Sequence, residues 1–356
     1  VLEHLGAAAA ADWTQRFVAK INFNTTVLHG LLSFILFAGA LHVDLERLRN
    51  ERRMIALFAL GGVVVSAFLV GTLMWAALNE LGIHFPYTYA LLFGALISPT
   101  DPIAVLAILR KAGVPESLEI RIVGESLFND GVAVVLFIII LQVVTGRGDV
   151  GPGHVVQVFA REAFGGIGLG VAGGAAAYWM LRRVDNHQVE VMITLGVVTG
   201  IYDMADRLGM SGPLAVVVTG LIVGNHGRAL AMSDRTRRRL DSFWELLDEV
   251  VNAILFILIG LQILVLPYFL SYFAGGAIAI PIVLLSRWIT VAVPVTLLRP
   301  LRTFVPHAIK IMTWGGLRGG ISVAMALSIP KGPEHDVIVA MTYMVVIFSI
   351  VVQGLT

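Results

Sequence analysis

The sequence predicts an all-α polytopic membrane protein in which two of the spanning helices are broken at mid-depth. Of its 356 residues, 57% are hydrophobic and only 14% are charged, which is too apolar for an ordinary soluble domain. Many stretches reach the roughly 20 apolar residues that a helix needs to span the hydrocarbon core. Prolines and glycines interrupt two of these stretches, although lipid tolerates broken backbone only where protein or water covers it.

The overall charge and the cysteine count exclude several classes of function. A net charge of +1 leaves no basic face of useful size, so no nucleic-acid partner is expected. The absence of cysteine excludes disulfides, thiolate metal sites and cysteine nucleophiles. Because Val1 is not a start methionine, an N-terminal piece of the protein is expected to be missing.

Eleven hydrophobic segments are predicted to span the membrane. They run near residues 24–42, 54–78, 87–110, 120–145, 156–181, 189–208, 212–227, 247–270, 274–298, 307–328 and 335–355. Arginine and lysine are concentrated in every second connection, after the first, third, fifth, seventh and ninth segments. The positive-inside rule therefore puts these connections and the C-terminus in the cytoplasm.

The connection 228–247 is expected to be a helix of its own. Its segment Met232–Leu247 is too polar to span, which favours a cytoplasmic surface helix that links two halves of the molecule. Trp244 and Leu246 are expected to touch the membrane interface. A soluble linker is the alternative.

The third span contains the sequence Ser98–Pro102, with Pro99 and Pro102 on either side of Asp101. Proline removes a backbone donor, clashes with the preceding turn and pushes the residue before it out of the helical region. The helix should therefore break here and leave bare backbone groups and a carboxylate within the membrane. The ion site of a transporter is the usual reason for such a break.

The tenth span is interrupted by two glycine pairs, Gly315-Gly316 and Gly319-Gly320. It lies seven spans after the third, so the two broken spans cross the membrane in opposite directions, as inverted repeats require. Spans one to four would then mirror spans eight to eleven. Glycines that only allow close helix packing are the alternative.

The fourth span carries a polar stripe within Gly124–Gly131. At about 100° per residue, Glu125 and Asn129 share one line of the helix, and Ser126 and Asp130 share the line beside it. Ionisable groups inside a membrane are costly, so they indicate a functional site.

Four charged residues from four spans are predicted to lie at a similar depth. Asp130 lies about 15 Å beyond Ile120 at 1.5 Å per residue, which is close to the bilayer centre. The same count from the nearest span end gives a similar depth to Asp101, Arg287 and Arg318. This convergence is difficult to ascribe to packing.

The polar groups at this depth suit a hard monovalent cation, which prefers carboxylate, hydroxyl, amide and carbonyl oxygens. Such a set would come from Asp130, Asp101, Ser126, Asn129 and the freed carbonyl of Thr100. Two close carboxylates in a poorly solvated pocket can hold a proton or a metal cation, each displacing the other. Competition at one site would produce exchange.

Glu125 needs a different role, because an unpaired charge at this depth would be costly. Arg287 is the better partner for a structural ion pair, and Arg318 is the second candidate. We expect Arg318 to stabilise the broken tenth span. Arginine suits both tasks because it stays charged and forks to two oxygens.

These residues resemble the monovalent cation:proton antiporter family, in the sodium/proton exchanger branch that includes bacterial NhaP-type proteins. The matching motifs are Ser98–Pro102, Gly124–Gly131 with its Asn129-Asp130 pair, Ser286-Arg287 and Gly315–Gly320. The resemblance covers nearly the whole chain, and the four motifs in this order are highly specific.

The resemblance implies an inverted-repeat antiporter fold of thirteen spans, with two crossed, broken helices. It implies a mobile six-helix core that moves as an elevator, here assigned to the helices at about 87–145 and 274–356. The remaining helices would form the scaffold of a homodimer.

The resemblance also implies the ion site and its stoichiometry. It puts sodium at Asp130, Asp101, Ser126 and the backbone of Thr100, and pairs Glu125 with Arg287. Asn129 replaces the second adjacent carboxylate of electrogenic relatives, which implies electroneutral exchange of one proton per cation.

Two features depart from the family pattern. Members usually carry a glutamate in a Phe-Glu-Gly context where this chain has Phe37-Ala38-Gly39, so a supplementary acidic ligand is missing. The chain also has two spans fewer than thirteen, and the missing pair is expected to be N-terminal.

The sequence therefore predicts a sodium (or lithium)/proton antiporter of the cell (inner) membrane, not an enzyme, with no cofactor beyond the transported ions. Its partners would be the monovalent cation, the proton, the lipid bilayer and a second copy of the chain. A potassium/proton antiporter is the alternative. An intramembrane aspartyl protease is suggested by Tyr202-Asp203, but no Gly-x-Gly-Asp partner follows on the next span.

Overall fold

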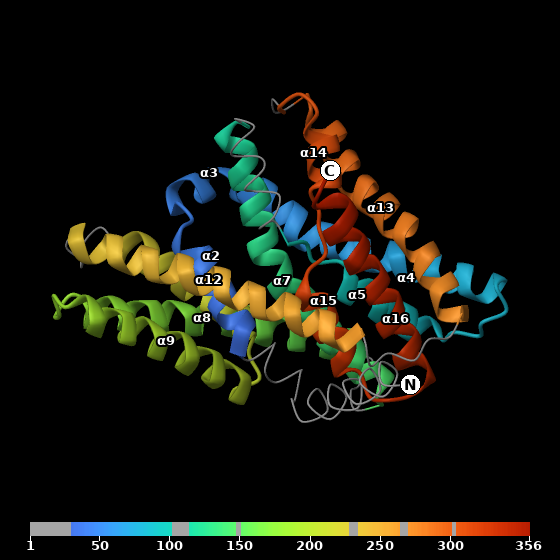
Figure 1. Cartoon of the computed structure of the whole chain (residues 1–356), viewed down its shortest axis with the longest axis horizontal. Helices are drawn as coiled ribbons and strands as arrows, with labels where there is room; N and C mark the ends of the chain where they lie inside the picture. Colours follow the sequence, from blue (N-terminus) through green and yellow to red (C-terminus); the bar gives the residue numbers. More distant parts are fainter. Residues whose placement is uncertain (1–29, 102–113, 147–150, 228–233, 264–269, 301–303) are drawn as a thin grey trace, which may run out of the picture.

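The computed structural model describes residues 30–101, 114–146, 151–227, 234–263, 270–300 and 304–356 (Figure 1). These residues form helices joined by short connections, and no strand occurs among them apart from one isolated bridge. The second half of the predicted third span, residues 102–110, lies outside the described residues.

The helices follow one another in an order close to the predicted spans. They are α2 (Leu32–Leu41), α3 (Leu45–Ala56), the π-helical turn η2 (Leu57–Gly62), α4 (Val63–Glu80), α5 (Tyr87–Ile97), α7 (Glu116–Val144), α8 (Pro152–Leu181), α9 (His187–Arg207), α10 (Gly212–Ile222), the turn η3 (Val223–Gly227), α12 (Asp234–Ile263), α13 (Leu270–Leu298), α14 (Ala308–Trp314), α15 (Gly320–Ser328), α16 (Pro333–Phe348) and the turn η4 (Ser349–Gln353).

Several of these helices are long and apolar enough to cross a membrane. Among the described residues there are five: Leu45–Glu80, Glu116–Val144, Gly153–Leu181, Ala274–Leu298 and Pro333–Gln353. Shorter apolar helices are Leu32–Leu41, Tyr87–Ile97 and Gly212–Asn225. The chain is thus a multi-pass helical membrane protein, and the total of eleven spans remains a prediction.

Two helices extend further than the sequence predicts. The helix of the second span begins at Leu45 instead of residue 54, because the Asp44 side chain accepts the backbone N–H groups of Glu46 and Arg47 at 2.9 and 3.1 Å and caps the helix. The linker segment and the eighth span form one helix, α12, with no break at Leu247.

The expected interfacial position of Trp244 is wrong. Its side chain is completely buried, with its ring centroid 4.6 Å from that of Phe37, and its indole N–H donates to the Thr194 hydroxyl at 3.1 Å. An indole can be buried at this position because its polar atom has a partner. Leu246 is 61% exposed.

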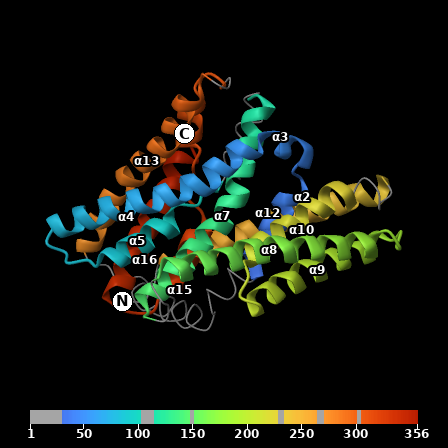
Figure 2. The same cartoon turned by 180° about the vertical axis from the view of Figure 1, so that it is seen from behind.

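Two apolar clusters divide the packing. The first, which we call the core cluster, joins side chains of α4, α5, α13, α15 and α16. The second, the scaffold cluster, joins α2, α8, α9 and α10. Helices α7 and α12 contribute to both, and Figures 1 and 2 show α7 between α8 and α9 on one side and α4 and α13 on the other.

Helix α4 packs in the core cluster, although the sequence analysis assigned its span to the scaffold. The Ser286 hydroxyl of α13 donates to the Ser66 hydroxyl of α4 at 3.2 Å, and both serines are buried. These two helices are the second and ninth predicted spans, which would correspond to each other in the predicted inverted repeat.

Candidate cation site

The two broken helices cross and satisfy each other's backbone. Helix α5 ends at Ile97, whereas α14 ends at Trp314 and α15 begins only at Gly320. Between these ends, the Asp101 N–H donates to the Leu317 carbonyl at 2.8 Å and forms an isolated antiparallel bridge. Backbone groups that lipid could not satisfy thus find a partner in the opposite break.

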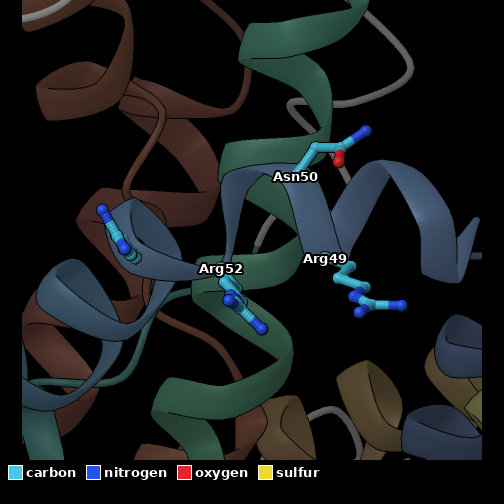
Figure 3. Close-up of a pocket in the computed structure, with 4 residues that line it drawn as sticks. Arg49, Asn50 and Arg52 are labelled. Atoms are coloured by element: carbon cyan, nitrogen blue, oxygen red, sulfur yellow. The ribbon is translucent and has the colours of Figure 1, made fainter.

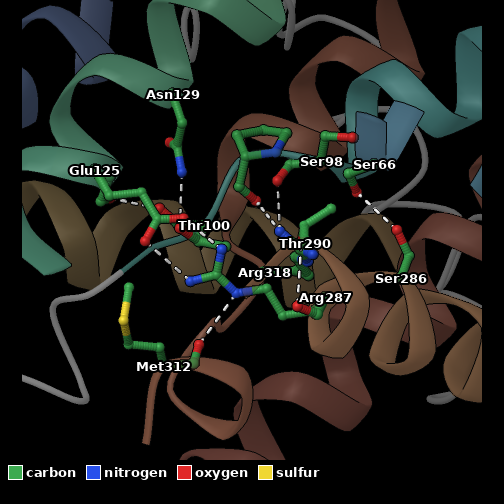
Figure 4. Close-up of polar contacts among 12 residues, drawn as sticks. Ser66, Ser98, Thr100, Glu125, Asn129, Ser286, Arg287, Thr290, Met312 and Arg318 are labelled. Carbon is green, nitrogen blue, oxygen red and sulfur yellow. Dashed lines mark hydrogen bonds and ion pairs between the residues drawn. The ribbon is translucent and has the colours of Figure 1, made fainter. Parts of the chain in front are cut away.

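The Arg318 side chain also reaches across the crossing, a contact that the sequence did not predict. Its guanidinium donates to the carbonyls of Ser98 and Pro99 at 2.6 and 2.8 Å (Figure 4). Arg318 is only 2% exposed. The cation therefore covers freed carbonyls of the third span, while its own backbone N–H donates to the Ser349 hydroxyl at 2.8 Å.

Glycine at the second break allows this close crossing. A Cβ atom added at Gly319 would lie 2.6 Å from Oδ2 of Asp101, and one added at Gly316 would lie 2.6 Å from Nε of Arg287. Real Cβ contacts essentially never come so close. These glycines therefore admit the polar groups of the site, beyond the helix packing proposed as their alternative role.

The polar stripe of α7 faces the break in the third span. The Ser126 hydroxyl donates to the Thr100 carbonyl, and Nδ2 of Asn129 donates to the Thr100 hydroxyl at 2.8 Å (Figure 4). All three residues are buried, and Oδ1 of Asn129 has no hydrogen-bond partner in the described part of the chain.

Asp130 and Asp101 are brought together at one cavity. Their charges lie close enough to repel each other, and Asp130 is only 7% exposed. Both line a cavity of about 720 Å³, together with Thr100 and Ser126. Glu125 does not line the cavity, and neither does Asn129, one of the five predicted ligands. Asn129 instead supports the lining residue Thr100 through the hydrogen bond to its hydroxyl.

The cavity connects the buried Asp130 and the half-buried Asp101 with exposed residues. Its lining includes Asp44, Arg47 and Glu116, which are exposed at the beginnings of α3 and α7. The cavity thus reaches the carboxylates from one side of the molecule. This side carries the arginine-rich connection after the first predicted span.

Glu125 pairs with Arg287, as the sequence analysis expected. Two hydrogen bonds join the guanidinium to the two carboxylate oxygens, one of them between Nη2 and Oε2 at 3.1 Å (Figure 4). Nε of Arg287 also donates to the Met312 carbonyl at 3.1 Å. Both side chains are buried, so the two charges neutralise each other within the protein.

The residues behind the protease alternative lie elsewhere. Asp203 is on α9, where it is 62% exposed and forms an ion pair with Arg207 at 2.8 Å. It does not line the cavity that holds Asp101 and Asp130. The exposed position gives no support to a membrane aspartyl protease.

A second hollow lies on α3 and is lined by Arg49, Asn50, Arg52 and Arg53 (Figure 3). Three of these side chains are cationic and none is a carboxylate. The hollow is therefore unsuited to a cation, and the oxygen-rich cavity at the crossing is the candidate site.

Several polar residues of the cavity were not singled out in the sequence, among them Asp248, Asn252 and Ser322. The first two belong to α12, whose apparent polarity up to Leu247 suggested a surface helix. Ser322 lies two residues after Gly320, in the first turn of α15. Its position directly after the predicted glycine break was the signal that could have identified it.

With this geometry established, comparisons with known proteins place the chain. A family model described as "Sodium/hydrogen exchanger, transmembrane" matches residues 9–356. The chain belongs to the sodium/hydrogen exchanger family. It is 47% identical to the Na(+)/H(+) antiporter NhaP of Pseudomonas aeruginosa, over all of this chain and 85% of that protein. It is 34% identical to the Na(+)/H(+) antiporter NhaH of Halobacillus dabanensis, over 96% of this chain and 84% of that protein.

The solved structures agree on the fold of this family member. The sodium proton antiporter MjNhaP1 from Methanocaldococcus jannaschii superposes with a TM-score of 0.73, covering 93% of this chain and 84% of that chain at 20% identity. The predicted membership in the bacterial NhaP-type branch and the helical antiporter fold are therefore confirmed.

Proposed function

We propose that this chain exchanges sodium or lithium for protons across the cell (inner) membrane, with its C-terminus in the cytoplasm. The observation that carries the proposal is the pairing of Asp130 and Asp101 at a cavity that also exposes Ser126 and Thr100. The family membership and the names of the relatives support it.

The site would work by competition. Two carboxylates that repel each other in a poorly solvated pocket gain from binding either a proton or a cation. Sodium would be held by Asp130, Asp101, Ser126 and the backbone of Thr100. A proton bound to Asp130 would neutralise the negative charge that attracts sodium. Asn129 adds no charge, so one proton leaves for each cation that enters and the exchange is electroneutral.

Alternating access would come from movement of the core cluster against the scaffold cluster. The site lies where α5, α7 and α15 meet, and α7 and α12 contribute side chains to both clusters. The core would comprise α4, α5, α7, α13, the pair α14 and α15, and α16, with the scaffold helices forming a homodimer. The cavity open beside α3 corresponds to the state that faces the cytoplasm.

Purified protein in proteoliposomes with an internal proton-sensitive dye tests the function. Sodium added outside should drive proton movement in the wild type and none in Asp130→Asn, because the amide cannot exchange a proton. Asp203→Asn is the matched control, since its carboxylate is exposed and does not line the cavity. Normal exchange by Asp130→Asn would show that the site is elsewhere.

A cation series in the same vesicles decides between sodium and potassium. The oxygen ligands alone suit either ion, whereas the named relatives are sodium/proton antiporters. We expect sodium and lithium to drive proton movement and potassium to fail. Faster exchange with potassium would establish the alternative.

A further inference from the structure

The wall of the cavity formed by α12 and α15 carries a second group of oxygen ligands. Asp248 and Asn252 lie one turn apart on α12, and Ser322 lies in the first turn of α15; all three line the same cavity as Asp101 and Asp130. We propose that Asp248, Asn252 and Ser322 form a second binding station for the monovalent cation, occupied on its way to Asp130. The station rests on the proposed exchange function and adds a site to it.

Asp248 is a partly buried carboxylate without a basic partner among the described residues. The amide of Asn252 donates to its Oδ1 at 3.1 Å. Its charge also lies close enough to that of Asp101 to be repelled by it. A cation beside Asp248 would relieve this repulsion and replace hydration that the carboxylate loses in the cavity.

Ser322 supplies an independent sign of a ligand. It is 1% exposed, and its hydroxyl has no hydrogen-bond partner in the part of the chain that the structure describes. Buried hydroxyls are normally satisfied, and a serine in a helix commonly bonds to a carbonyl one turn earlier. Here the preceding turn is the Gly315–Gly319 break, so the hydroxyl stays available to the cavity.

The three ligands come from elements that are held by different parts of the molecule. Trp244, one turn before Asp248, anchors α12 in the scaffold cluster, whereas α15 packs against α16 in the core cluster. A cation between them would therefore sit on the boundary along which the core is proposed to move. Apart from Asp101 and Asp130, the other charged or titratable residues of the lining are exposed or half-buried: His42, Asp44, Arg47, Glu116, Glu119 and Glu245.

The test is the sodium concentration that gives half-maximal exchange in proteoliposomes. Asp248→Asn should raise it about tenfold, which corresponds to about 1.4 kcal/mol of cation binding, and Ser322→Ala should raise it less. In the double variant Asp248→Asn/Ser322→Ala, the fold-increase in this concentration should be smaller than the product of the two single fold-increases, because both ligands bind the same ion. Asp248→Glu should restore much of the affinity, since it keeps the carboxylate.

Two control variants separate the station from nonspecific effects. Glu249→Gln removes a neighbouring exposed carboxylate that does not line the cavity. Ser328→Ala removes a hydroxyl of α15 that is already bonded to the Met325 carbonyl at 2.7 Å. Neither should change the half-maximal sodium concentration, and elution as a single species in gel filtration should show that all variants are folded.

Three outcomes overturn the station. Unchanged half-maximal concentrations in Asp248→Asn and Ser322→Ala would show that the wall binds no ion. An Asp248→Asn effect that disappears in about 1 M choline chloride would indicate charge attraction alone, because the Debye length falls to about 3 Å. If Glu249→Gln raised the half-maximal sodium concentration as much as Asp248→Asn does, this would also indicate charge attraction alone. If the wild type shows no sodium-driven proton movement, the exchange function itself fails.

Discussion

Two buried carboxylates on one helix have opposite environments in this protein. Glu125 and Asp130 lie little more than a turn apart on α7, and both are less than 10% exposed. Glu125 is held by the guanidinium of Arg287 and does not line the cavity. Asp130 lines the cavity together with Asp101, whose like charge repels it. Burial alone therefore does not identify a binding site.

The difference lies in how each charge is compensated. A carboxylate whose partner is a fixed arginine gains little from a mobile cation, and its loss should damage the fold. A carboxylate whose neighbour is another carboxylate gains from any cation or proton that enters. The first arrangement suits a structural element and the second an exchanger.

The largest effect on stability should come from breaking the fixed pair. Glu125→Gln leaves Arg287 as a buried charge without its counterion, which we expect to cost about 3–5 kcal/mol. The melting temperature of the purified protein should fall by several degrees, whereas Asp203→Asn, which breaks an exposed pair, should change it by less than about 1 °C. Equal melting temperatures for both variants would contradict the structural role of Glu125.

A smaller effect is expected where the two breaks approach each other. Gly319→Ala places a methyl group 2.6 Å from Oδ2 of Asp101 and should displace that carboxylate. We expect the half-maximal sodium concentration to rise about tenfold, equivalent to about 1.4 kcal/mol. Gly168→Ala is the control, because no atom lies within 4 Å of the added Cβ. If the half-maximal sodium concentration of Gly319→Ala were unchanged, sodium binding would not depend on the position of the Asp101 carboxylate, and Asp101 would not be a ligand.

The smallest expected effect is that of membrane potential on the wild type. Because Asn129 contributes no charge, the loaded carrier should move no net charge when one proton replaces one cation. Imposing about 100 mV with potassium and valinomycin should leave the exchange rate nearly unchanged, although each net charge moved would be worth about 2.3 kcal/mol. A steep dependence on potential would contradict one-for-one exchange.

Much of the site could be predicted because its signals are local. The prolines around Thr100 and Asp101 predicted the break, and the helical periodicity of α7 predicted the stripe that ends at Asp130. The pairing of Glu125 with Arg287 followed from the cost of isolated charges. Each inference needed only neighbouring residues or a charge balance.

The remaining features depend on contacts between distant segments. The reach of Arg318 to the Ser98 and Pro99 carbonyls arises from the crossing itself, which places the two breaks within hydrogen-bond distance. The burial of Trp244 depends on Phe37 and Thr194, which belong to other helices. No periodicity within one segment carries this information.

The central claim is that a cation and a proton compete for Asp130, and proton release on sodium binding tests it most directly. Sodium chloride added to purified protein in weakly buffered detergent solution should release close to one proton per bound sodium, read with a pH-sensitive dye. Choline chloride should release none. Asp130→Asn should abolish the sodium signal, whereas Asp203→Asn should retain it. Sodium binding without proton release in the wild type, or an undiminished signal in Asp130→Asn, would contradict the account.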